Sequence, residues 1–189
     1  MFRILVVCTA NICRSPATAA LLRNELQKLV ANGVIHVDSA GVSATANMPA
    51  CGLSGRLMNE SVARRHTGSA DPRSSLARHR SRRVTPALAQ RADLVLTLER
   101  AHRAELARMA ATARPKTFTL RQAANLSRVV RSFVAAQEIP VGAPPLPADS
   151  VSRLRWWAAE LDAARGSAPR HMNLAEADPA GLMVSWHPG

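Results

Sequence analysis

A cysteine and an arginine, separated by five residues, stand near the start of the chain in a pattern suited to phosphate chemistry. A phosphate monoester is a dianion, and a short loop curled around it can direct successive backbone N–H groups at its oxygens. The planar guanidinium of Arg14 can bind two of those oxygens, and the same positive surroundings favour the nucleophilic thiolate of Cys8. The spacing therefore predicts Cys8 and Arg14 as catalytic residues. The predicted phosphate-binding residues are Thr9, Ala10, Asn11, Ile12, Cys13, Arg14 and Ser15.

The elements on either side of this segment are predicted to be a strand and a helix. Arg3 to Val7 is a short apolar run rich in β-branched residues, which is typical of a buried strand. Ser15 and Pro16 then open a run with helical periodicity that continues to Val30. Ser15 is the expected N-cap and Pro16 the first helical residue. The dipole of this helix would add to the attraction for an anion.

Strands and helices alternate along the rest of the chain. Further strands are expected at residues 35–38, 92–98 and 117–120, and helices at 58–66, from Thr85-Pro86, at 99–110 and at 150–164. This alternation predicts an α/β fold, a doubly wound parallel four-stranded sheet flanked by helices, with the catalytic loop between the first strand and the first helix. Ligands bind beyond the carboxyl ends of the strands in such sheets, where the Cys8 loop would lie. We expect a single domain over residues 1–189, with an atypical loop-rich tail at about 166–189.

The composition describes a globular chain with a strong positive charge. Of its 189 residues 47% are hydrophobic, and the formal net charge is +12, almost all of it from arginine. The basic residues do not gather with aromatic ones and no nucleic-acid motif is present, so no nucleic-acid partner is expected. Three cysteines do not make a secreted disulfide framework, and no stretch approaches the roughly 20 apolar residues that cross a membrane. We therefore expect no membrane span, a cytoplasmic location, and no metal or cofactor.

Five segments occur in a characteristic order along the chain. They are Val7-Cys8-Thr9-Ala10-Asn11-Ile12-Cys13-Arg14-Ser15-Pro16, Val37-Asp38-Ser39-Ala40-Gly41, His79-Arg80-Ser81-Arg82, Ala92-Asp93-Leu94-Val95-Leu96-Thr97 and His102-Arg103. Together they resemble the low-molecular-weight protein tyrosine phosphatase family over about residues 3–120. The resemblance implies a phosphatase that hydrolyses phosphotyrosine-type monoesters through a phosphocysteine. Its substrate would be a phosphorylated protein or a small aryl phosphate.

The resemblance also implies a role for each residue around the loop. Cys8 would form the phosphocysteine, and Arg14 would hold the phosphate. Cys13 would be a reversible partner for Cys8 under oxidation. The residues that would fix the loop and orient the thiolate through hydrogen bonds are Asn11, Ser15, Ser39 and His79.

The proton donor of the family is the aspartate of an Asp-Pro pair late in the chain. The mechanism needs a carboxylic acid that protonates the leaving oxygen and then deprotonates water. Asp71 precedes a proline but comes before His79, which is too early for the family's order, whereas Asp178 fits that order and is the predicted acid. Two features depart from the family pattern. Ala10 stands where glycine is usual, and Ala180, in place of an aromatic residue, follows Asp178-Pro179.

Three other functions remain open for the same loop. Arsenate reductases share the fold but would need resolving thiols well after the loop, and no cysteine follows Cys51. Phosphoarginine phosphatases place a threonine directly after the loop asparagine, where this chain has Ile12, which favours an aryl phosphate. A non-catalytic module that binds phosphate or phosphoproteins would keep the cradle and lack the acid. The sequence carries no signal for an oligomeric state.

Overall fold

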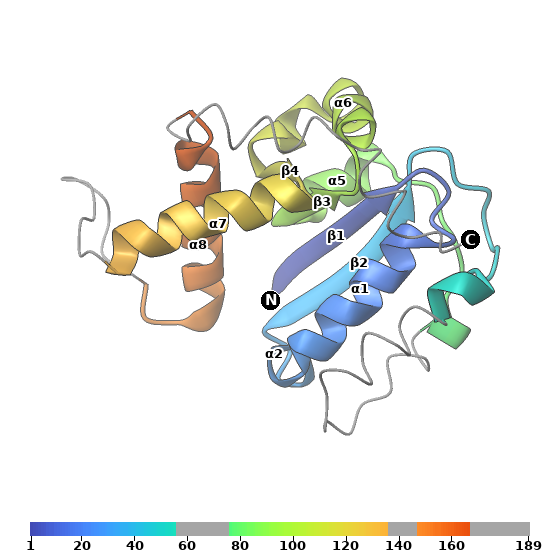
Figure 1. Ribbon diagram of the computed structural model, residues 1–189, viewed down its shortest axis with the longest axis horizontal. Coiled ribbons are helices and arrows are strands. Elements are labelled where there is room, and N and C mark those ends of the chain that lie inside the picture. The colour runs from blue at the N-terminus through green and yellow to red at the C-terminus, as the bar shows by residue number, and fades with distance from the viewer. Residues whose placement is uncertain (56–75, 136–146, 167–189) are drawn as a thin grey trace, which may run out of the picture.

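The computed structural model describes residues 1–55, 76–135 and 147–166, and in them a sheet lies between layers of helices (Figure 1). The strands are β1 (Phe2–Cys8), β2 (Ile35–Gly41), β3 (Leu94–Thr97) and β4 (Thr117–Thr119). The helices are α1 (Arg14–Glu25), α2 (Gln27–Ala31), α5 (Pro86–Arg91), α6 (Arg100–Met109), the 3-10 helix η1 (Ala111–Lys116), α7 (Leu120–Ala135) and α8 (Ser150–Ala164).

The sheet has the strand order β2-β1-β3-β4, and every neighbouring pair is parallel. This confirms the predicted doubly wound, four-stranded parallel sheet. β1 lies between β2 and β3, so the chain crosses from one side of β1 to the other after β2. Cys8 ends β1 at this switch point, which is where open α/β sheets bind their ligands.

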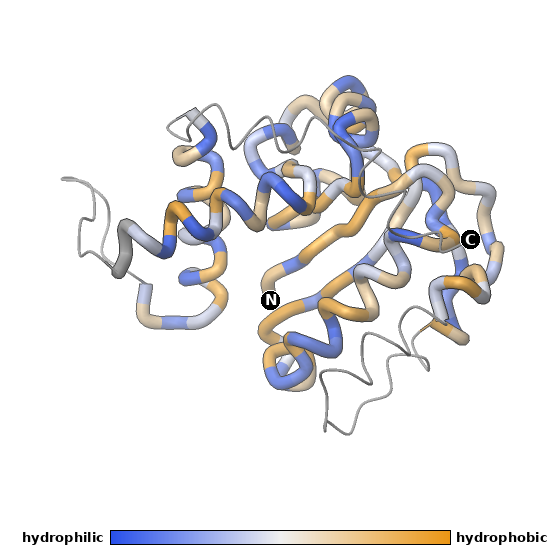
Figure 2. The backbone as a smooth tube through the Cα atoms, in the orientation of Figure 1, coloured by the Kyte–Doolittle hydropathy of each residue, from blue (hydrophilic) through white to orange (hydrophobic). Residues whose placement is uncertain are grey.

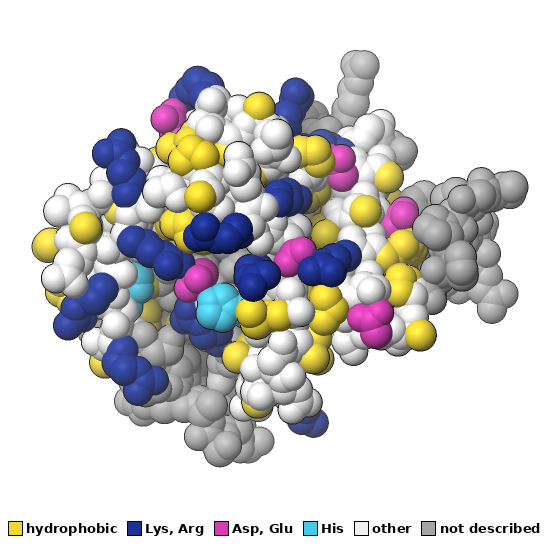
Figure 3. Space-filling model, turned by 180° about the vertical axis from the view of Figure 1, so that it is seen from behind, with side chains coloured by type: hydrophobic (Ala, Val, Ile, Leu, Met, Phe, Trp, Pro, Cys, Tyr) yellow, Lys and Arg dark blue, Asp and Glu magenta, His cyan; other side chains and the backbone are white. Residues whose placement is uncertain are grey.

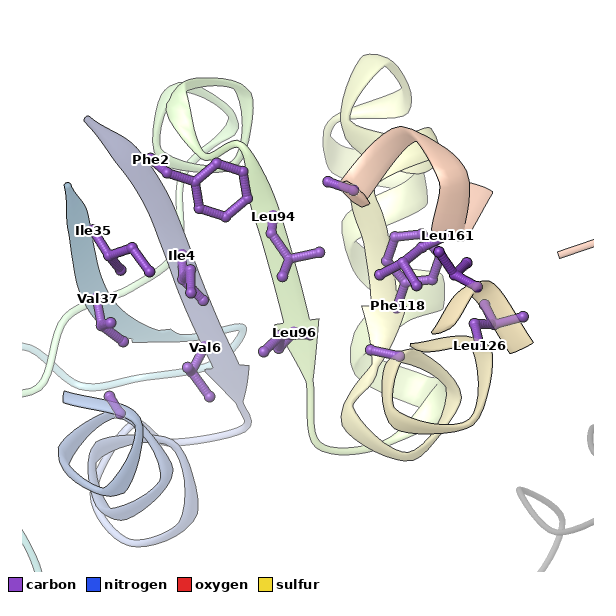
Figure 4. Close-up of a cluster of buried hydrophobic side chains, with 14 of the residues drawn as sticks. Phe2, Ile4, Val6, Ile35, Val37, Leu94, Leu96, Phe118, Leu126 and Leu161 are labelled. Carbon is purple, nitrogen blue, oxygen red and sulfur yellow. The ribbon is translucent and has the colours of Figure 1, made fainter. Parts of the chain in front are cut away.

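β1 is buried on both faces because helices cover both sides of the sheet. Ile4 and Val6 belong to a cluster formed with α1, α7 and α8, which also holds Phe2 and Phe118 (Figure 4). Leu5 and Val7 point to the opposite face, into a cluster beneath α5 and α6. Figure 2 shows that β1 is hydrophobic along most of its length. The core therefore anchors the strand that ends at Cys8 from two directions.

Two of the predicted helices begin as their sequences indicate. Thr85 Oγ1 accepts a hydrogen bond from Leu88 N at 3.2 Å, and Pro86 is the first residue of α5. Asp149 Oδ1 accepts a hydrogen bond from Ser152 N at 2.9 Å and caps α8 in the same way. The predicted helices at Thr85-Pro86 and at residues 150–164 are confirmed.

The start of α1 differs from the prediction, because Ser15 is not its N-cap. The helix begins at Arg14, Cys13 holds the cap position without a side-chain cap bond, and Ser15 lies buried in the first turn. The Ser15 hydroxyl contacts Cys8, Asn11 and the backbone of β2, so it is not available to cap the helix. The predicted run to residue 30 is also divided, since Leu26 leaves the helical backbone with φ −102° and ψ 21° between α1 and α2.

Other elements extend or add to the expected set. β2 continues beyond the predicted strand at residues 35–38, through Ser39 and Ala40 to Gly41. α7 was not expected, although Ala123, Leu126 and Val130 form a buried stripe along it. The helix predicted at residues 58–66 lies outside the described residues. Within the described residues, no helix combines the length and apolar character needed to cross a bilayer.

Candidate active site

Cys8 lies at the carboxyl end of β1, where its thiol meets a hydroxyl from the helix that follows. The residue is 3% exposed, and its Sγ lies 3.0 Å from Ser15 Oγ in the first turn of α1. Ser15 is itself fully buried, so the contact is shielded from water. A hydroxyl at this position can donate a hydrogen bond to a thiolate and stabilise the charged nucleophile.

The Ser15 hydroxyl has a choice of acceptors for its single proton. It accepts a hydrogen bond from Asn11 Nδ2 at 2.9 Å and lies 3.3 Å from the backbone oxygen of Ala40. When Cys8 is a thiol, Ser15 can donate to Ala40 and accept from sulfur. When Cys8 is a thiolate, rotation of the hydroxyl turns the proton toward sulfur. The site can therefore serve both protonation states of Cys8 without moving a heavy atom.

Asn11 holds the centre of the loop in a conformation that few residues adopt. Its φ is 54°, in the left-handed region, and its side chain is fully buried. Its Nδ2 donates to Ser15 Oγ and to Ser39 Oγ, each at 2.9 Å. Its Oδ1 accepts from the backbone N of Arg82 at 3.0 Å. One amide thus joins the loop, α1, β2 and the segment before α5.

His79 binds the same asparagine through its backbone. His79 Nε2 lies 2.7 Å from the carbonyl oxygen of Asn11, and because a carbonyl only accepts, Nε2 must carry the proton and donate. Burial lowers the pKa of His79, the bond to Asn11 opposes this, and the charges of Arg23, Arg82 and Arg80 lower it further. The ring is therefore held in its neutral form with Nε2 protonated at neutral pH. The four predicted loop-supporting residues are in one hydrogen-bonded network.

Gly41, the last residue of β2, lies directly against the loop backbone. A Cβ atom built on it would lie 2.4 Å from the carbonyl oxygen of Thr9 and 2.8 Å from the backbone N of Asn11. The next two residues hold the loop as well, since Val42 N donates to Cys8 O and Ser43 N to Thr9 O, both at 2.9 Å. A glycine is required here because only a residue without a side chain allows this approach.

The other flank of the loop is held by side chains that follow β3. Arg14 forms an ion pair with Glu99, the residue before α6, and its second guanidinium nitrogen lies 3.4 Å from Thr9 Oγ1. Thr9 Oγ1 also lies 2.9 Å from Nε2 of His102 in α6. The Arg14 and Glu99 side chains are 42% and 37% exposed, so this pair is in contact with solvent.

His102 is buried beside this ion pair and is neutral. Burial, together with the charge of Arg14, lowers the pKa of His102 to about 4. Its side chain is 3% exposed, and within the described part of the chain its Nδ1 has no hydrogen-bond partner. A neutral ring beside Arg14 leaves the positive charge of the site on the guanidinium, where a phosphate would bind.

The remaining predicted phosphate-binding residues line the loop between these two flanks. Ala10 and Ile12 are half-buried, and Cys13 is exposed at the amino terminus of α1. The helix places its positive dipole end at this loop. Lysine and arginine side chains are spread over the surface shown in Figure 3, with acidic side chains between them, so the wider surface adds to the attraction for an anion.

Four residues of the site have no role in the sequence prediction: Gly41, Arg82, Glu99 and His102. Glu99 was detectable in part, because it follows β3, the neighbour of β1, at the edge of the sheet where ligands bind. Arg82 binds the loop through its backbone N–H, which any residue could supply, so its identity gives no indication of the contact.

The two candidates for the proton donor come from the Asp-Pro pairs of the sequence. Asp178 and Asp71 both lie outside the described residues. In the part of the chain that the structure covers, the carboxylate at the loop is Glu99, and no group of three metal-ligating side chains comes together there.

Comparison with known proteins identifies one family. Residues 3–130 match the model of the low molecular weight phosphotyrosine protein phosphatase family, which is the family that the sequence motifs resemble. The chain is 36% identical over 103 residues to the probable low molecular weight protein-tyrosine-phosphatase EpsP of Ralstonia nicotianae. That match covers 54% of this chain and 59% of EpsP, less than two thirds of the relative's length.

Two further comparisons bear on substrate and fold. The chain is 32% identical over 119 residues to the protein-arginine-phosphatase of Bacillus subtilis, a match that covers 63% of this chain and 70% of that protein. The structure resembles the tyrosine phosphatase Wzb from Escherichia coli K30 in complex with sulphate, with a TM-score of 0.51 and 27% identity. This likeness covers 93% of this chain and 99% of the Wzb chain.

Proposed function

Because the chain belongs to the low molecular weight phosphotyrosine protein phosphatase family, we propose that it hydrolyses phosphate monoesters through a phosphocysteine formed on Cys8. The observation that carries this proposal is the 3.0 Å contact between Cys8 Sγ and Ser15 Oγ at the carboxyl end of a central parallel strand. A buried thiol that faces a hydroxyl and precedes a helix amino terminus is suited to attack a bound dianion.

The proposed reaction has two steps. The Cys8 thiolate attacks phosphorus, the bond from phosphorus to the ester oxygen breaks, and the general acid protonates that oxygen. Arg14 and the backbone N–H groups of the loop hold the three non-bridging oxygens as charge moves through the transition state. In the second step the same carboxylate takes a proton from water, and the water oxygen displaces Cys8 from phosphorus. The products are an alcohol or phenol, inorganic phosphate and the free thiolate.

Asp178 is the proposed general acid on sequence grounds. Glu99 is the described carboxylate at the loop, but it is engaged in an ion pair with Arg14 and is not assigned the proton-donating role. Phenyl phosphate needs a proton on its leaving oxygen more than p-nitrophenyl phosphate does. Because kcat/KM reports on the step in which the leaving group departs, Asp178→Ala should lower kcat/KM for phenyl phosphate about 100-fold and for p-nitrophenyl phosphate much less. An equal effect on both substrates, or none, would remove Asp178 from this role.

The proposed substrates are aryl phosphates, including phosphotyrosine in proteins. Ile12 supports this choice, whereas the similarity to a protein-arginine-phosphatase makes phosphoarginine the second candidate. Peptides carrying phosphotyrosine or phosphoarginine, compared at equal concentration, separate the two. We expect a higher kcat/KM for phosphotyrosine, and we expect Ile12→Thr to shift the ratio toward phosphoarginine. A wild type that prefers phosphoarginine would contradict the substrate assignment and leave the phosphocysteine chemistry intact.

The activity itself is tested with p-nitrophenyl phosphate and two proteins, the wild type and Cys8→Ser. Turnover by the wild type and its complete loss in Cys8→Ser, with phosphate binding retained, is the expected result. Vanadate binding without turnover by the wild type would contradict hydrolysis and support a phosphate-binding module. Arsenate-dependent oxidation of an added thiol would support arsenate reductase chemistry instead. The comparisons named above favour neither of these two alternatives.

A further inference from the structure

Cys13 and Cys51 form a pair of thiols beside the loop, and the proposed reaction uses neither sulfur. Cys51 Sγ lies 3.0 Å from the hydroxyl oxygen of Ser54. Cys51 N donates to the carbonyl oxygen of Ile12 at 3.0 Å, and Ser54 Oγ donates to the carbonyl oxygen of Cys13 at 3.0 Å. The two cysteines are therefore already held together by backbone contacts on both sides, before any bond joins their sulfurs.

The two thiols differ in how readily they ionise. Burial raises the pKa of Cys13 to about 11, together with its hydrogen bond to Cys51 and the negative charges of Cys51 and Cys8. Burial also opposes ionisation of Cys51, but hydrogen bonds from Cys13 and Ser54 outweigh it and lower the pKa of Cys51. Of the two thiols Cys51 therefore ionises more readily, which suits Cys51 as the attacking sulfur and Cys13 as the resolving one.

The contacts of Cys8 contrast with those of this pair. Cys8 is buried and contacts the Ser15 hydroxyl, whereas Cys13 is exposed and Cys51 is partly exposed. The family resemblance pairs Cys13 with Cys8 under oxidation, yet Ser54 also holds Cys51 next to Cys13, since its hydroxyl oxygen lies 3.0 Å from Cys51 Sγ and 3.0 Å from the carbonyl oxygen of Cys13. When an oxidant enters from solvent, Cys13 can therefore form a disulfide with Cys51 instead of with the catalytic Cys8.

We propose that Cys13 and Cys51 are an oxidative modification site, which hydrogen peroxide converts to a disulfide while Cys8 stays reduced. The Cys51 thiolate attacks one peroxide oxygen, the O–O bond breaks, and a sulfenic acid and hydroxide result. Cys13 sulfur then attacks the Cys51 sulfur, the S–O bond breaks, and the departing hydroxide takes the Cys13 proton as water. Two thiols have lost two electrons in all, and one peroxide has become two waters.

The same pair can also release Cys8 if peroxide reaches it first. A sulfenic acid on Cys8 would be attacked by Cys13 to give a Cys8–Cys13 disulfide and water. Cys51 thiolate would then attack the Cys13 sulfur, forming the Cys13–Cys51 disulfide and returning Cys8 as a thiolate. Both routes end at the Cys13–Cys51 disulfide, so the presence of Cys51 determines that Cys13 is not left bonded to Cys8.

Peptide mapping of the full chain tests the proposal directly. Trypsin leaves Cys8 and Cys13 together in the peptide 4–14 and Cys51 in the peptide 29–56. After one equivalent of peroxide and alkylation without reductant, the wild type should yield these two peptides joined, with the alkyl group on Cys8. Cys51→Ser should yield peptide 4–14 with an internal disulfide. A wild type that forms the internal Cys8–Cys13 disulfide as Cys51→Ser does would overturn the proposal.

A second variant separates this inference from the proposed function. Cys8→Ser cannot form a phosphocysteine, but it should still join peptides 4–14 and 29–56 through Cys13 and Cys51. If Cys8→Ser failed to form this disulfide, the direct route, in which Cys51 reacts with peroxide, would be wrong. That result would not bear on the proposed phosphatase activity of the wild type.

The consequence for activity rests on the proposed function and is measured last. Under reducing conditions Cys51→Ser should match the wild type in p-nitrophenyl phosphate turnover. After peroxide the wild type should keep most of its activity, while Cys51→Ser should lose nearly all of it and recover with dithiothreitol. Equal loss in the two proteins would contradict the protective role.

Discussion

The two flanks of the Cys8 loop are built in different ways. On the β2 side, the buried side chains of Asn11, Ser15 and Ser39 make a network of neutral hydrogen bonds that half-buried His79 joins, and Gly41 lies against the backbone. On the β3 side, Arg14 pairs with Glu99 in contact with solvent, and His102 reaches Thr9. The first flank fixes the path of the loop backbone. The second holds Arg14, the side chain proposed to bind the phosphate, in an exposed ion pair that can exchange partners.

The difference follows from what each flank must do. A cradle of backbone N–H groups works only if its shape exists before phosphate arrives, which requires dry and fully satisfied hydrogen bonds. A guanidinium that binds a dianion must release its resting partner, which requires a weak, hydrated ion pair. Substitutions on the β2 side should therefore cost both stability and activity, and those on the β3 side should change binding and pH dependence with little loss of fold.

Gly41→Ala should give the largest effect. Its Cβ would lie 2.4 Å from Thr9 O, a backbone atom that can move only if the loop moves. We expect p-nitrophenyl phosphate turnover to fall about 100-fold and the free energy of unfolding to fall by about 1–3 kcal/mol. Gly52→Ala is the matched control, since a Cβ there meets nothing within 4 Å. Normal turnover by Gly41→Ala would show that the loop tolerates displacement and would refute the rigid cradle.

Asn11→Ala should come next in size. The substitution removes three hydrogen bonds from a buried site and leaves Ser15, Ser39 and the Arg82 N–H short of partners. Asn47 also has a positive φ, 67°, but is exposed, so Asn47→Ala carries the backbone cost without the network. Chemical denaturation should show a loss of about 3 kcal/mol for Asn11→Ala and about 1 kcal/mol for Asn47→Ala. Equal losses would mean that the network adds nothing beyond the backbone conformation.

His102 should make stability depend on pH. Its pKa is near 4 in the folded protein and 6.5 in the reference state, so the unfolded chain binds the proton more readily. Stability due to neutral His102 is full above about pH 6.5 and falls as the pH drops toward 4, by an amount on the order of 3 kcal/mol. His102→Gln should flatten this part of the profile of unfolding free energy against pH. An unchanged slope in His102→Gln would assign the effect to other groups.

Glu99→Gln should give the smallest change in stability. The ion pair with Arg14 is exposed, so the free energy of unfolding should change by less than about 1 kcal/mol. Inorganic phosphate should bind a few-fold more tightly as a competitive inhibitor, because a negative charge beside the dianion is gone and Arg14 has lost its resting partner. Glu105→Gln, which breaks the exposed pair with Arg108, is the control. Weaker phosphate binding would mean that Glu99 positions Arg14 more than it competes for it.

Much of the fold was predictable because the patterns are local. The apolar β-branched run before Cys8 and the alternation of strands and helices were enough for the parallel sheet and the position of the loop. The helix α7 was not predicted, although Ala123, Leu126 and Val130 recur at helical spacing in the sequence. Ser15 was misassigned as a cap because serine at a helix start usually caps it, and here sulfur, an amide and a carbonyl occupy its hydroxyl instead.

The residues on the β2 side of the site were predictable from the sequence, whereas those on the β3 side were not. The roles of Asn11, Ser39 and His79 were predicted from the family resemblance, because a family pattern includes residues that are distant in sequence but close in the fold. Glu99 and His102 lie at the loop because β3, which precedes them, is next to β1 in the sheet. Strand order is a long-range property that cannot be predicted from single residues. The pairing of Cys13 with Cys51 depends in the same way on a tertiary contact between the loop and residues 51–54.

The most direct test of the central claim is to trap the phosphoenzyme. Wild-type protein mixed with p-nitrophenyl phosphate and rapidly quenched in alkali, where the sulfur–phosphorus bond is stable, should carry one phosphate, mapped by mass spectrometry to Cys8 in peptide 4–14. Cys8→Ala should carry none and should show no turnover. Turnover by the wild type without any phosphate on Cys8, or turnover that survives Cys8→Ala, would contradict the account.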